Sequence, residues 1–189
     1  MCVLNRQFYA RAAAKVAHEL LGKILAHGAV SGRIVETEAY LGEGDGAAHS
    51  AAGLTERTRV IFGPPGHAYV YFIYGMYNCL NLVAEREGEA GCVLIRAIEP
   101  LTGLALMRRR RPAARRIEDL ANGPGKLTRA FGITLGHNGA DVTRGPITVH
   151  APEDDVAVES AVSRRIGITK SADLPLRFFV KGSRFVSRG

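Results

Sequence analysis

Two glutamates separated by a single residue, Glu36 and Glu38, lie in a run of apolar and β-branched residues that predicts a strand. Residues at positions i and i+2 of a strand share a face, so both carboxylates and Tyr40 should point to one side, with the carboxylates roughly 7 Å apart. A like charge at that distance raises the pKa of one carboxyl group, which suits a general acid or base. Two glutamates on a solvent-facing strand would give the same pattern, so both interpretations stay open.

Tyrosine is concentrated in one stretch, because four of the six tyrosines fall between residues 69 and 77 in a chain without tryptophan. The stretch predicts a β-hairpin with strands at residues 69–73 and 79–83 and a turn at 74–76, where Gly75 permits a positive φ. Tyr69, Tyr71 and Ile73 should share one face, whereas Tyr74 stands beside the turn with little to pack on. A core strand with a leftover tyrosine at its corner is the alternative interpretation.

Histidine and cysteine show no spacing that predicts a metal centre. Cys2, Cys79 and Cys92 are odd in number and lack ligand spacing, which fits reduced thiols in a cytosolic compartment. His49 stands alone in a glycine-rich loop, where a histidine is more often a surface residue than a functional one. Without a histidine pair or a Cys/His cluster, we expect no metal, and we expect no cofactor. No serine or cysteine lies in a nucleophile motif either.

The chain of 189 residues is basic, with 25 Lys and Arg against 18 Asp and Glu, a net charge of +7. Its length suits one domain, and its charge favours a polyanionic partner. No apolar run approaches the ~20 residues of a membrane span, and the N-terminus lacks the pattern of a signal peptide. We therefore expect a cytoplasmic protein that is not secreted. Residues 108–116 carry a basic run that either contacts phosphates or forms a solvated, partly disordered loop.

Helices and strands are predicted in an order that does not alternate, which favours the α+β class over βαβ units. Helices are expected at residues 8–21, closed by Gly22, and at 101–111 and 127–131; further strands at 23–26, 33–39, 92–99 (ended by Pro100), 146–150 and 177–180. A turn at 27–32 joins the first two strands, and residues 42–59 form a long polar loop. Residues 122–128 fail as a Walker A motif but fit a turn into a helix, with or without an anion at its N-terminus.

In this order, the segments 33–40, 48–50, 69–77 with Asn81, 93–97 with Glu99 and Pro100, and 123–127 resemble the 3-methyladenine (alkyladenine) DNA glycosylase family. The resemblance runs from about Arg6 to Arg184. It implies one α+β domain over residues 1–189, with a curved, largely antiparallel sheet surrounded by helices and a protruding, DNA-intercalating hairpin. It also implies a monomeric enzyme that needs no cofactor and acts on double-stranded DNA containing damaged purines.

Each motif position then carries an implied role. Glu38 matches the general base that activates water for attack at the sugar C1′, and Arg96 matches a residue near that water and the target phosphate. The resemblance also implies that the base stacks between Tyr40 and Tyr71 on one wall and His49 on the other. The other implied roles are exclusion of guanine for Asn81, intercalation for Tyr74, and phosphate contact for Arg57, Arg59 and Lys126. Such an enzyme flips alkylated or deaminated purines, such as 3-methyladenine, hypoxanthine or ethenoadenine, out of the duplex. No lysine lies in the two key stretches, so we expect hydrolysis without lyase activity.

Two other classes of protein fit parts of the pattern. A non-catalytic damaged-DNA binding protein would use the basic surface and the stacking hairpin, but it has no need for Glu38 beside a stacking tyrosine. An O-glycoside hydrolase would use Glu36 and Glu38 as its carboxylate pair, but it leaves the net charge and Tyr74 unexplained. The sequence does not rank the damaged purines as substrates.

Overall fold

The computed structural model describes residues 2–153 and 158–187, and within them nine strands form one connected sheet. The strand order is β1-β7-β2-β3-β6-β5-β4, with β9 also paired to β3 and β8 paired to β9, and every pairing is antiparallel. The strands are β1 (Cys2–Val3), β2 (Ile24–His27), β3 (Val30–Leu41), β4 (Ala68–Ile73), β5 (Tyr77–Val83), β6 (Gly91–Thr102), β7 (Ile147–Ala151), β8 (Ser160–Ser163) and β9 (Arg177–Val180). The α+β class and the antiparallel sheet are therefore as the sequence predicts.

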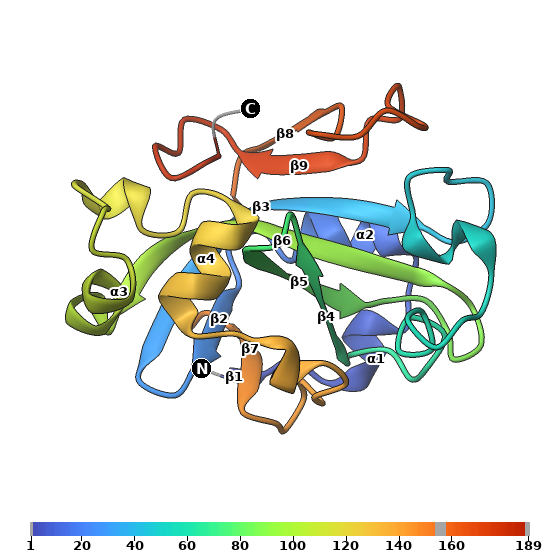
Figure 1. Ribbon diagram of the computed structural model, residues 1–189, viewed down its shortest axis with the longest axis horizontal. Coiled ribbons are helices and arrows are strands. Elements are labelled where there is room, and N and C mark those ends of the chain that lie inside the picture. The colour runs from blue at the N-terminus through green and yellow to red at the C-terminus, as the bar shows by residue number, and fades with distance from the viewer. Residues whose placement is uncertain (1, 154–157, 188–189) are drawn as a thin grey trace.

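The helices are α1 (Arg6–Tyr9), α2 (Ala13–Glu19), α3 (Leu104–Arg110) and α4 (Pro124–Phe131), with short 3-10 turns η1 (His49–Ala52), η2 (Ile117–Asp119) and η3 (Leu135–His137). Helix α2 packs on β3 and β6, and α4 packs on β5 and β6. Figure 1 shows β3 and β6 crossing the molecule, with α3 at one end and the loop that follows β3 at the other. A main core cluster joins these layers through buried side chains such as Leu20, Ile34, Ile95 and Phe131. None of the described helices is long and apolar enough to cross a membrane.

The prediction of one helix over residues 8–21 is wrong, because the chain breaks between α1 and α2. Ala12 has an extended ψ of 128°, and the amide of Ala13 donates to Glu85 Oε1 at 2.6 Å. Arg11 Nε donates to the carbonyl of Phe8 at 2.8 Å, which closes the end of α1. A carboxylate from a distant turn thus takes the place of the backbone bond that would have continued the helix.

Strand lengths also differ from the prediction. Pro100 does not end its strand, since β6 continues to Thr102 with Pro100 opposite Gly32. The register shifts between Ser31 and Gly32, which is the kind of irregularity that accommodates a residue without an N–H in a sheet. A Cβ on Gly32 would lie 2.6 Å from the carbonyl oxygen of Glu99, so glycine is required at this crossing. The turn predicted over residues 27–32 is shorter than expected, because only two residues separate the end of β2 from the start of β3.

The two later helices also begin at other residues than predicted. Helix α3 starts after Gly103, which has a φ of +72°, because Leu101 and Thr102 still belong to β6. Helix α4 starts at Pro124, a residue suited to the first helical turn, three residues before the predicted start. The first residues of the basic run 108–116 lie in the last turn of α3, so that part of the run is helical and not a loop.

Candidate active site

A cavity of about 340 Å³ opens between β3, the β4–β5 hairpin, β6, the start of α4 and residues 166–168. Its lining is mostly aromatic and apolar, with a few polar groups that converge on it, as in many small-molecule sites. Six predicted site residues line this cavity: Tyr40, His49, Tyr71, Tyr74, Asn81 and Arg96. The other lining residues include Tyr69, Ile73, Tyr77, Cys79, Cys92, Pro124, Gly125, Ile166 and Gly167. The prediction that Tyr69, Tyr71 and Ile73 share one face is confirmed, because all three line this cavity.

Glu36 and Glu38 are both completely buried, which excludes the solvent-facing interpretation of the pair. Arg96 reaches both, with Nε 3.0 Å from Glu36 Oε1 and Nη1 3.3 Å from Glu38 Oε2. Burial alone would lower the pKa of Arg96, but the carboxylates of Glu38 and Glu36 raise it, so the guanidinium stays charged. One cation therefore compensates two buried carboxylates, and a second is close to Glu36 alone, since Arg177 Nε lies 2.7 Å from Glu36 Oε1.

The two glutamates differ in what holds them. Glu36 accepts from Arg96, Arg177 and both the backbone N–H and hydroxyl of Ser187, at 2.7 to 3.0 Å, so both of its oxygens are occupied. These contacts make Glu36 the anchor of the C-terminal segment on β3.

Glu38 lies directly behind the cavity wall and is held by three residues that line it. Tyr40 Oη donates to Glu38 Oε2 at 2.9 Å, and the backbone N–H of Ile166 donates to Glu38 Oε1 at 2.7 Å. Burial and the carboxylate of Glu38 raise the pKa of Tyr40, so its hydroxyl keeps the proton that it donates. A carboxylate oxygen offers two lone pairs, which leaves Oε1 able to accept from one further group.

An aromatic wall faces Tyr40 across the cavity. The ring of His49 packs edge-on against Tyr71 at 4.5 Å between centroids, and Tyr71 lies 5.5 Å from Tyr69. The expectation that Tyr71 and His49 lie on opposite walls is therefore wrong, because their rings are in direct contact. Tyr69 belongs to the same wall, although it was not among the predicted site residues. Cys92 lies beside Asn81 among the lining residues, and burial raises its pKa to about 12, so it stays a thiol.

His49 is held between two hydrogen bonds that fix its ring. Nδ1 lies 2.9 Å from Tyr69 Oη, and Nε2 lies 3.3 Å from Arg57 Nη2. Because a guanidinium only donates, Nε2 accepts and Nδ1 carries the proton. Burial, and then the charge of Arg57, lower the pKa of His49 to about 4, so the ring is neutral at neutral pH.

Replacing Arg57 with glutamine should raise the pKa of His49, because the nearby positive charge disappears while the burial remains. The unfolded chain binds a proton near pH 6.5 and the folded protein only near pH 4, so this group destabilises the fold as the pH falls through that window. NMR titration of the imidazole signals measures the pKa of His49 in the wild type and in Arg57→Gln. Lys15→Gln removes one charge elsewhere and serves as the control, and an unchanged His49 titration in Arg57→Gln would contradict the arrangement.

Tyr40 and Ile166 are themselves positioned by an ion pair that the sequence analysis missed. Arg165 and Asp45 are fully buried at the side chain and pair through two bonds, Nη1 to Oδ2 at 2.6 Å and Nη2 to Oδ1 at 2.8 Å. The guanidinium of Arg165 also lies over the ring of Tyr40, 4.7 Å from its centroid. Asp45 belongs to the loop predicted over residues 42–59, so this loop is anchored to the site from its start.

The remaining predicted residues differ in how exposed they are and in what they bind. Asn81 is buried and donates to the carbonyl of Tyr69 at 3.2 Å, whereas Tyr74 is 76% exposed with a φ of +54° at the hairpin turn. Arg59 is ion-paired with Glu56, and Lys126 Nζ donates to Asn122 Oδ1 at 2.8 Å. In the part of the chain that the structure describes, no group of three or more His, Cys, Asp or Glu side chains could hold a metal ion.

Comparison with known proteins was made on the whole chain. Residues 7–184 match a family model described as methylpurine-DNA glycosylase. A protein of Methanoculleus marisnigri is 52% identical over 191 residues that cover 98% of each chain, and one of Bradyrhizobium diazoefficiens is 50% identical over 98% of this chain and 90% of its own. A protein of Methanocella arvoryzae is 51% identical over all of this chain and 97% of its own. All three are provisionally named 3-methyladenine DNA glycosylases.

Proposed function

The chain belongs to the methylpurine-DNA glycosylase family and is a DNA glycosylase, and we propose that it excises alkylated or deaminated purines from duplex DNA as a monomer. The observation that carries this proposal is Glu38, a fully buried carboxylate held at the wall of an aromatic cavity by Tyr40, Arg96 and Ile166. A purine inside a duplex cannot reach such a cavity, so the nucleotide must be flipped out of the stack.

The flipped base is proposed to stack between Tyr40 on one side and Tyr71 with His49 on the other. Stacking contributes about 1–3 kcal/mol per base and tolerates many bases, and aromatic faces favour electron-poor or cationic purines. A neutral His49 adds no repulsion against a cationic base. Asn81 on the cavity wall would exclude the exocyclic amino group of guanine.

Glu38 is proposed as the general base. A water between Glu38 and the sugar gives a proton to the carboxylate while its oxygen bonds to C1′ and the bond from C1′ to the base breaks, its electron pair leaving with the base. A cationic base such as 3-methyladenine leaves as a neutral molecule, whereas hypoxanthine must first gain a proton. Arg96 Nη1, 3.3 Å from Glu38 Oε2, places a positive charge beside this carboxylate. The products are the free base and an abasic site, without strand cleavage.

The exposed side chains at the mouth are proposed to hold the DNA. Tyr74 at the tip of the hairpin is 76% exposed and would fill the gap that the flipped nucleotide leaves, as wedges in the minor groove do. Arg57 and Lys126 would contact backbone phosphates at the cavity mouth, and Arg59 would exchange Glu56 for a phosphate.

The test is single-turnover excision by the wild-type protein on duplexes that each carry one hypoxanthine or ethenoadenine, and on methylated DNA. We expect release of the free base and an abasic site that breaks only on treatment with alkali. The same duplex without a lesion is the control. Tight binding of lesion DNA without release of any base would contradict the proposal and favour the non-catalytic binding protein.

A further inference from the structure

Several arginines of α3, its following turn and α4 have no carboxylate partner among the described residues. With Arg110, which donates only to the carbonyl of Ala130, there are six: Arg108, Arg109, Arg110, Arg111, Arg115 and Arg129, here called the α3–α4 arginine surface. The carboxylates nearby are already used, because Asp119 pairs with Arg116 and Glu118 with Arg184. Four of the six side chains are exposed, and Arg110 and Arg111 are half-buried, so this end of the molecule carries uncompensated positive charge.

Two of these arginines come from neighbouring elements, because Arg111 directly follows α3 and Arg129 lies in the last turn of α4, which packs on α3. Arg111 donates through Nη2 to the carbonyl of Asp119 at 3.2 Å, while its buried Nε has no partner. Burial, and then the charge of Arg129, lower the pKa of Arg111, although Tyr77 and Asp119 act in the opposite direction. Asp119 compensates this charge only in part, because its carboxylate is paired with Arg116, so an anion bound beside Arg111 and Arg129 would lower the electrostatic cost.

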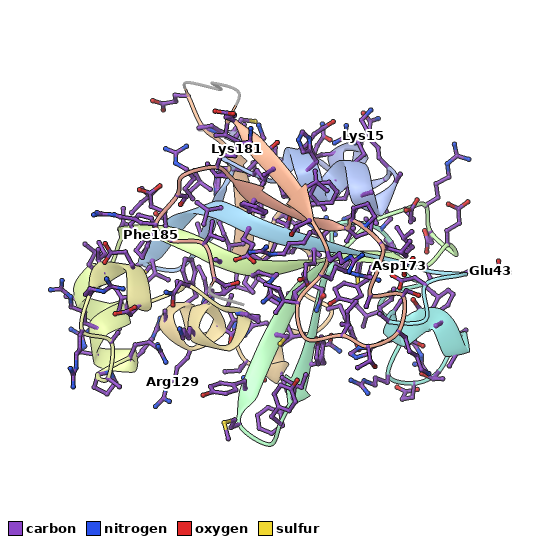
Figure 2. The ribbon with its side chains drawn as sticks, turned by 90° about the horizontal axis from the view of Figure 1, so that it is seen from above. Lys15, Glu43, Arg129, Asp173, Lys181 and Phe185 are labelled. Atoms are coloured by element: carbon purple, nitrogen blue, oxygen red, sulfur yellow. The ribbon has the colours of Figure 1, made fainter. Side chains whose placement is uncertain are left out.

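The pair is adjacent to the proposed DNA-binding face. Tyr77 begins β5 and lines the cavity, and α4 abuts it so closely that a Cβ on Gly125 would lie 2.7 Å from its ring. Figure 2 shows Arg129 pointing to the side toward which the hairpin extends, and Glu43, at the start of the loop that carries Arg57, on the opposite flank. Arg129 and the loop that begins at Glu43 and carries Arg57 therefore lie on opposite flanks of the hairpin.

We infer that Arg111 and Arg129 bind the phosphodiester backbone of duplex DNA on the flank of the hairpin away from Arg57. This inference rests on the proposed function, because it needs the duplex to lie across the hairpin. Arginine suits the contact, since its planar fork binds two phosphate oxygens at once and stays charged in partly buried positions. The enzyme would then grip the duplex on both sides of the flipped nucleotide, and the DNA it covers would be longer than the cavity alone requires.

The test measures binding of a duplex with one stable abasic-site analogue across a series of salt concentrations. The slope of log K against log salt should become shallower by about 0.9 for Arg129→Gln and by about 1.8 for Arg111→Gln with Arg129→Gln. Arg129 is exposed, so Arg129→Gln should fold normally and still tests the inference if the double variant does not fold. The matched control is the double variant Lys15→Gln with Arg86→Gln, which removes two charges from other exposed positions. Lys15 lies on the side opposite the hairpin. The salt slope of this control should therefore equal that of the wild type.

Shortening the duplex locates the contact. The difference between the wild type and the double variant should vanish when the duplex is shortened on one side of the analogue, and persist when it is shortened on the other. A slope equal to that of the control variant, or a difference that survives both truncations, would overturn the inference. Excision by the wild type on the same duplexes with hypoxanthine tests the proposed function separately, so the two can fail independently.

Discussion

Replacing Glu38 with glutamine is expected to slow base excision by about 100-fold or more, the scale of a lost general base, while lesion DNA still binds. The substitution is nearly isosteric, and the site can satisfy the amide. Its oxygen can accept from the N–H of Ile166, and its NH2 can donate to Tyr40 Oη, which accepts as well as donates. Arg96 retains Glu36 as a partner at 3.0 Å. Single-turnover rates at saturating enzyme, with binding measured on the same duplex, separate the two effects.

Glu36→Gln is the matched control. It removes the same charge at a position two residues before Glu38, and Glu36 contacts the same arginine, Arg96. Its oxygens are filled by Arg177, Arg96 and Ser187, so the change should destabilise the fold and the C-terminal segment more than it slows excision. Thermal unfolding of both variants provides the comparison. The assignment of Glu38 would be wrong if Glu38→Gln excised at the wild-type rate, or if Glu36→Gln had the larger effect on the rate.

Local patterns predicted the parts of the site that lie within single elements. The alternation in β3 predicted that Glu36, Glu38 and Tyr40 share a face, and Arg96, whose role only the family resemblance implied, contacts both glutamates. The aromatic stretch gave a hairpin because β-branched and aromatic residues flank a glycine turn, and β4 pairs with β5 from Ala68 to Ile73. These features depend on neighbouring residues, so the sequence carries them directly.

Long-range contacts set what the sequence could not predict. Glu36 and Glu38 look equivalent in β3, and they differ because Ser187 and Ile166, 151 and 128 residues away, donate to one each. The break before α2 depends on Glu85, 72 residues from Ala13. No period, turn or cap signals such partners, and propensity yields to them once the chain is packed.

The Asp45–Arg165 pair has the same origin, since 120 residues separate the two and neither stands in a recognisable motif. The signal that could have found it is Asp45 itself, an acidic residue just after the Glu36–Tyr40 strand in a glycine-rich loop too long to be a simple connection. Arg165 precedes Ile166 and Gly167, which line the cavity. The loop therefore contributes two residues to the site: His49, which lines the cavity, and Asp45, whose buried carboxylate holds Arg165.

Replacing Asp45 with asparagine is expected to destabilise the protein by about 3–5 kcal/mol, because Arg165 would keep a fully buried charge without its counter-ion. The asparagine side chain would keep the shape but offer a single oxygen, while Arg165 Nε is already buried without a partner. Urea unfolding measures the change. Asp173→Asn, at an exposed residue, should stay within about 0.5 kcal/mol of the wild type, and an equally small change in Asp45→Asn would contradict the prediction.

The stabilisation by Asp45 should depend on pH in one direction. Burial acts to raise the pKa of Asp45, but the bonds from Arg165 and from the amides of Ala47 and Leu41 lower it below its ordinary value of 3.8. The folded state thus releases the proton more readily than the unfolded chain, so the contribution is complete above pH 3.8 and is lost as the pH falls through the lower, folded value. The difference in unfolding free energy between the wild type and Asp45→Asn should therefore narrow in acid.

Stability and positioning can then be separated at this pair. Asp45→Leu combined with Arg165→Met replaces buried charges with apolar groups, a change that is often neutral or stabilising, so most of the lost stability should return. Excision should not return, because the cation over the ring of Tyr40 is gone and the segment that directs the Ile166 N–H to Glu38 has lost its anchor. Recovery of both properties would mean that the pair only fills space. Recovery of stability alone would mean that the fold tolerates any well-packed pair here, whereas Glu38 requires this one.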